Sequence, residues 1–164
     1  MPRLRFGSRP ARSAEPRTYV GLWLRAGLRG ENELRRQLTG KLNGGKDGWN
    51  YDEPAVVDAA CELAVRRFFP PGVDVREIAA VASDMRQKSK SLPGQMKMEA
   101  VIRAALGETD VVIDDIKPPE LLHIRGAIVV YLFIILGAKF SVDELVVEAE
   151  NIAFERGWKP PLAD

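Results

Sequence analysis

The spacing in this chain that most resembles a chemical site is that of Glu120 and His123, which stand three residues apart where a helix is expected. Residues at this spacing lie on one face of a helix, so a carboxylate and an imidazole would point the same way. Ferritin-like di-metal sites use two such pairs with further carboxylates, but His123 is the single histidine here. A mononuclear metal site is the alternative, with Asp114 or Asp115 as its third ligand. The simpler expectation is a histidine that caps or lines the core.

Other residue types that carry catalysis are scarce. Cys61 is the single cysteine and occupies an apolar helical position, so we expect a buried, unreactive thiol. No serine lies in a G-x-S-x-G context, and neither common glycine-rich phosphate loop is present. The acidic segment around Asp114 lacks the glycine and the spacing of a calcium loop. The sequence therefore predicts no catalytic residue, no cofactor and no bound metal.

Charge is distributed unevenly along the 164 residues, although the net charge is only +1. Residues 1–41 hold ten basic and three acidic side chains, and the rest of the chain holds 14 basic and 20 acidic ones. Residues 1–17 are rich in Pro, Ser, Gly and Arg and have few apolar side chains, so we expect a flexible basic arm. Its arginines could neutralise nucleic-acid phosphates or meet an acidic protein, and they are Arg3, Arg5, Arg9, Arg12 and Arg17.

Two aromatic residues, Trp49 and Tyr51, stand beside a glycine-containing loop at residues 44–51. Aromatic side chains at a flexible turn can form the lip of a ligand site, although packing onto a helix end is the simpler interpretation. We include both as candidate interaction residues.

Helix-start and helix-stop residues recur every 15 to 25 positions along the chain. Thr18, Asp52, Asp74 and Ser141 each precede apolar residues spaced three and four apart, and glycines such as Gly30 follow such segments. We therefore predict an all-α fold, with a single compact helical domain over residues 18–164. It would contain about six or seven helices around a central apolar helix.

The segment that most needs interpretation is 127–136, which is uninterrupted apolar sequence. Arg125 and Lys139 enclose only 13 uncharged residues, whereas a membrane span needs about 20, so we predict no span. Its β-branched residues would suit a buried strand, but the candidate partner strands are short. A central helix over residues 119–137, apolar on all sides and surrounded by the other helices, fits best.

Several short runs, most of which contain arginine, are notable in this sequence, and they are Leu28-Arg29-Gly30, Gly48-Trp49, Leu63-Ala64-Val65-Arg66-Arg67-Phe68, Val75-Arg76-Glu77-Ile78, and Ile102-Arg103 followed by Leu106-Gly107-Glu108. With these runs the chain resembles a family of uncharacterised all-helical proteins from high-GC Gram-positive bacteria. The resemblance implies an all-helical bacterial protein and no particular activity.

The leading functional hypothesis is a non-enzymatic, cytoplasmic helical module that acts through protein contacts, as an adaptor, subunit or regulator. The central helix would be easiest to bury if a partner protein or a second copy covered one side of it. A nucleic-acid-associated protein that uses the basic arm is the first alternative. An enzyme or metal-binding helical protein is the second.

Overall fold

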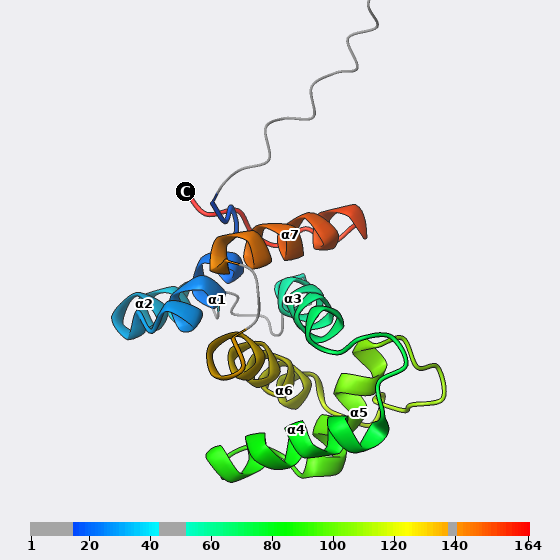
Figure 1. The fold of residues 1–164 in the computed structure, drawn as a ribbon. Coiled ribbons are helices and arrows are strands. Elements are labelled where there is room, and N and C mark those ends of the chain that lie inside the picture. Colours follow the sequence, from blue (N-terminus) through cyan, green and yellow to red (C-terminus); the bar gives the residue numbers. More distant parts are fainter. Residues whose placement is uncertain (1–14, 43–51, 138–140) are drawn as a thin grey trace, which may run out of the picture.

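The computed structural model describes residues 15–42, 52–137 and 141–164 (Figure 1). These ranges contain seven α-helices and one π-helical turn but no β-strand, which confirms the predicted all-α fold. The helices are α1 (Tyr19–Arg29), α2 (Asn32–Leu42), α3 (Pro54–Phe68), α4 (Val75–Lys88), α5 (Gln95–Ala105), α6 (Pro118–Val130) and α7 (Val142–Glu155), and the π turn η1 (Tyr131–Ile135) continues α6.

Most helices begin at the residues that the sequence indicates. The side chains of Thr18, Asp74 and Ser141 each accept a hydrogen bond from a backbone N–H in the first turn of α1, α4 and α7, respectively. These bonds satisfy donors that a helix start otherwise leaves unpaired. Gly30 ends α1 at a φ of 70°, in the left-handed region that favours glycine.

The predicted cap at Asp52 is wrong. Helix α3 begins at Pro54, and Glu53 takes the cap position without a side-chain capping hydrogen bond. A proline at the first helical position has no N–H to satisfy and already holds a helical φ. Pro54 therefore favours the start of α3 at this position.

The apolar segment 127–136 is helical, so the helix prediction is confirmed and the strand alternative is wrong. It forms the end of α6 and the turn η1, which pack against α3 in the middle of the bundle (Figure 1). Ile124, Ile128 and Leu132 are spaced four apart and are completely buried. This face supplies the centre of the core.

The expectation that other helices surround this segment on all sides is wrong. Val130 is 37% exposed, and Ile134 and Ile135 are each about half exposed. Over Pro118–Ile135 only 28% of the residues are buried. By length and composition alone these 18 residues could also cross a membrane, a test that core helices of soluble proteins pass as well.

The start of α1 is fixed to α7 and to the C-terminal segment. The backbone N–H groups of Arg17 and Thr18 donate to the buried carboxylate of Glu150, at 3.0 and 2.7 Å. The Arg17 guanidinium lies 4.9 Å from the centre of the Phe154 ring and donates to Asn151. Arg17 therefore belongs to the folded domain, and its assignment to a flexible arm is wrong.

Candidate functional site

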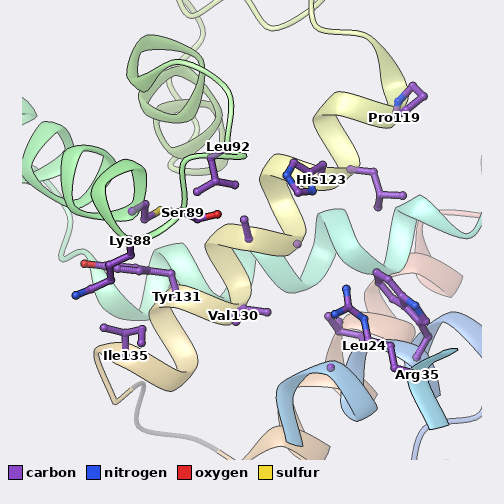
Figure 2. Close-up of a pocket in the computed structure, with 16 residues that line it drawn as sticks. Leu24, Arg35, Lys88, Ser89, Leu92, Pro119, His123, Val130, Tyr131 and Ile135 are labelled. Carbon is purple, nitrogen blue, oxygen red and sulfur yellow. The ribbon is translucent and has the colours of Figure 1, made fainter. Parts of the chain in front are cut away.

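An open groove runs along one side of α6 and encloses about 500 Å³ (Figure 2). Helix α6 and the turn η1 form its floor, the helices α1 and α2 form one wall, and the end of α4 with the segment after it forms the other. Figure 2 shows Leu24 and Arg35 on one side of α6, and Lys88, Ser89 and Leu92 on the other. The floor residues are Pro119, Leu122, His123, Gly126, Ala127, Val130, Tyr131 and Ile135.

The floor is a second apolar face of α6. Pro119, His123, Gly126 and Val130 follow one another at steps of four, three and four, which places them on one side of a helix. The core face, represented by Ile128, points away from them. One apolar face of α6 therefore fills the core and another lines the groove, while Glu120 and Arg125 form ion pairs with Lys97 and Asp58.

The wall formed by α1 and α2 is stabilised by contacts to the indole ring of Trp23. The Arg35 guanidinium lies 5.0 Å from the centre of the Trp23 ring, a cation–π distance. The Trp23 Nε1 donates to Thr39 at 3.1 Å. Trp23 thus ties the two helices together and presents part of its ring to the groove.

At the opposite wall a small polar cluster joins α4 to the π turn. The Tyr131 hydroxyl donates to Asp84, and the Lys88 Nζ lies 3.7 Å from the same carboxylate. Burial, together with the hydrogen bond and the charge of Asp84, raises the pKa of Tyr131 to about 12. The phenol therefore stays protonated well above pH 7 and donates its hydrogen bond to Asp84. Tyr131 is the first residue of η1, and such π-helical turns are often found at functional sites.

The ionisable residues that line the groove are mostly basic, although Lys88 is paired with Asp84 beside the wall. Its ionisable lining side chains besides Tyr131 are Arg35, Lys88 and His123, and none of the lining residues is acidic. Most of the remaining lining is apolar. A ligand suited to this groove would therefore present apolar groups to the floor and negative charge to the walls.

The predicted metal ligands do not come together. Glu120 forms an ion pair with Lys97 at 2.7 Å, and Asp114 is exposed on the connector before α6. His123 is exposed and lines the groove, so the expectation of a core histidine is wrong. In the part of the chain that the structure describes, no three histidine, cysteine or acidic side chains gather as a metal site.

The predicted interaction residues are largely separate from the groove. Arg17 is held on α7, as described above. The other candidates lie outside the described residues, and they are Arg3, Arg5, Arg9, Arg12, Trp49 and Tyr51.

Apart from His123, sequence reasoning missed the residues that line the groove. The signal for them was indirect: a glycine, Gly126, within a helix that has apolar residues on more than one face. Which face lacks a neighbour depends on where α1 and α4 lie, and no local pattern gives that placement.

Comparison with protein-family models, with curated proteins and with solved structures finds no match for this chain. The resemblance to helical proteins of high-GC bacteria therefore stays a prediction. A function has to be argued from the groove.

Proposed function

We propose that this protein is a non-enzymatic interaction module that holds a partner protein in the groove along α6. The observation that carries the proposal is the uncovered apolar face of α6 at the floor of a groove of about 500 Å³. Contiguous apolar surface on a folded protein that is rimmed by polar residues is typical of a binding surface. Covering it would remove apolar area from water, which favours association.

The shape of the groove suits a segment of protein chain. The floor from Pro119 to Tyr131 spans twelve residue steps, or about 18 Å at 1.5 Å per residue. Three turns of a partner helix have that length. Helices that bind grooves in this way insert apolar side chains from successive turns.

A second copy of the chain that presents the same face would fit the groove poorly. The floor is recessed between two walls, so the walls of two copies would meet before their α6 helices did. Lys88 and Arg35 would also approach the same cations of the other copy. These two features favour a different partner surface.

Affinity capture from the native host tests the proposal, with and without nuclease treatment. The blocking variant is Gly126→Trp and the matched control is Gly40→Trp on the exposed surface of α2. In the described part of the chain, no other segment comes within 4 Å of an added Cβ at either position. We expect one stoichiometric protein with the wild type and the control, and its loss with the blocking variant.

Two results would count against the proposal. Equal recovery of the partner by Gly126→Trp would place the binding surface elsewhere. Recovery that disappears after nuclease treatment would instead favour the nucleic-acid alternative, in which the N-terminal arginines neutralise phosphates.

A further inference from the structure

We infer that the groove binds an amphipathic helix of a partner protein, which would pack there as one more helix of the bundle. This partner helix would carry acidic residues along its flanks. This inference rests on the proposed function and specifies the chemistry of the partner. Three features of the groove support it: the spacing of its floor, its volume and its charges.

The floor has the spacing of a helix-packing seam. Steps of four, three and four residues from Pro119 to Val130 match the alternation by which one helix packs along another. The core seam of α6 is already filled by the neighbouring helices, and no helix of the described residues lies on the second seam, which lines the groove.

Gly126 lies at the middle of this seam. A glycine inside a helix costs about 1 kcal/mol relative to alanine. Within the described residues nothing lies within 4 Å of the place where its Cβ would be, so no neighbour there requires a glycine. Together with Ala127 it leaves a low point at which the backbone of a second helix can approach closely.

The volume of the groove fits the anchors of one short helix. A cavity of about 150 Å³ accepts a benzene molecule, so about 500 Å³ has room for about three ring-sized side chains. Three anchors on successive turns, at i, i+3 or i+4, and i+7, are typical of a helix bound in a groove.

The walls determine the charge of the occupant. Arg35 stacks on Trp23 and has no carboxylate within 4.0 Å in the described part of the chain. On the other wall, Lys88 has a half-exposed side chain and lies 3.7 Å from Asp84. Acidic side chains on both flanks of a bound helix would meet these cations, whereas basic flanks would be repelled.

A phage-displayed library of random 16-residue peptides, selected on the full-length protein, tests the inference. We expect enriched peptides with apolar residues at helical spacing and with an excess of Asp and Glu. The best peptide, made synthetically, should bind the wild type and Gly40→Trp alike and Gly126→Trp at least tenfold more weakly. The variant Arg35→Gln/Lys88→Gln should weaken binding and flatten its salt dependence, while circular dichroism confirms that each variant is folded.

Other outcomes would overturn the inference. Enriched peptides without acidic residues or helical spacing would do so, as would binding that Gly126→Trp leaves unchanged. A wild-type dimer in light scattering that Gly126→Trp dissociates would assign the groove to a second copy. If the peptides fail but Gly126→Trp still loses the captured partner, the proposed function stands and only the chemistry of its occupant is wrong.

Discussion

Glu150 joins two ends of the chain that lie more than 130 positions apart. Its carboxylate is completely buried and accepts hydrogen bonds from the backbone N–H groups of Arg17 and Thr18 and from the Thr18 hydroxyl. These donors stand at the start of α1, where the helix dipole also favours a negative charge. The contact fixes α1, and with it one wall of the groove.

Replacing Glu150 with alanine should lower the free energy of unfolding by about 3 kcal/mol, because buried backbone donors would lose their acceptor. Glu155→Ala, on the exposed end of the same helix, is the control and should change it by less than about 0.5 kcal/mol. Urea denaturation followed by circular dichroism measures both. A similar loss in the two variants would show that the Glu150 contact is not stabilising.

Cys61 gives a pH-dependent prediction. Burial raises the pKa of its thiol from 9.0 to about 12, opposed by the charge of Arg125 and aided by those of Asp58 and Glu62. Between these values the unfolded chain loses the proton and the folded chain keeps it, so stability should fall as pH rises from 9 towards 12. The slope from this one group is at most about 1.4 kcal/mol per pH unit.

The test compares the wild type with Cys61→Ala by denaturant unfolding at several pH values from 8 to 11. Tyr131 titrates in both proteins and cancels from the difference. We expect the wild type to lose stability more steeply than the variant above pH 9. Parallel curves would contradict a buried, neutral thiol.

At the scale of the helix, two glycines should respond in opposite ways to the same substitution. Gly126 has an ordinary helical backbone and open space around it, so Gly126→Ala should stabilise the protein by about 0.5–1 kcal/mol. Gly30 also has open space but a φ of 70°, so Gly30→Ala should destabilise it by about 1 kcal/mol. Thermal and urea unfolding measure the two effects. A loss of stability in Gly126→Ala would mean that the fold itself requires this glycine.

Local sequence signals predicted the helices well and their surroundings poorly. The caps at Thr18, Asp74 and Ser141 were correct because a capping hydrogen bond involves residues only two or three positions apart. The cap at Asp52 failed because Pro54 starts α3 without one. All-α architecture follows from such local signals.

The candidate site could not be predicted in the same way. An apolar helix is compatible with complete burial or with one face in a groove, and the sequence of α6 does not distinguish them. The exposure of His123 depends on the gap between α1 and α4, and the docking of Arg17 depends on α7. These contacts join residues that are far apart in the chain, and the spacing of apolar residues along the sequence does not predict them.

At the scale of the whole molecule, the bundle is closed on one side of α6 and open on the other. On the closed side α6 packs against α3 (Figure 1). On the open side the groove separates α1 and α2 from the end of α4 (Figure 2). The open side combines an apolar floor with one basic residue on each wall, Arg35 and Lys88. The proposed partner helix would complete the bundle there.

Hydrogen exchange of the protein alone and with its captured partner tests this claim most directly, because it maps the contact surface along the whole chain. We predict slowed exchange in α6 between Pro119 and Tyr131 and at the two walls, with little change on the outer surface of α5. Unchanged exchange in α6, with protection confined to another surface, would contradict the assignment of the groove as the binding site.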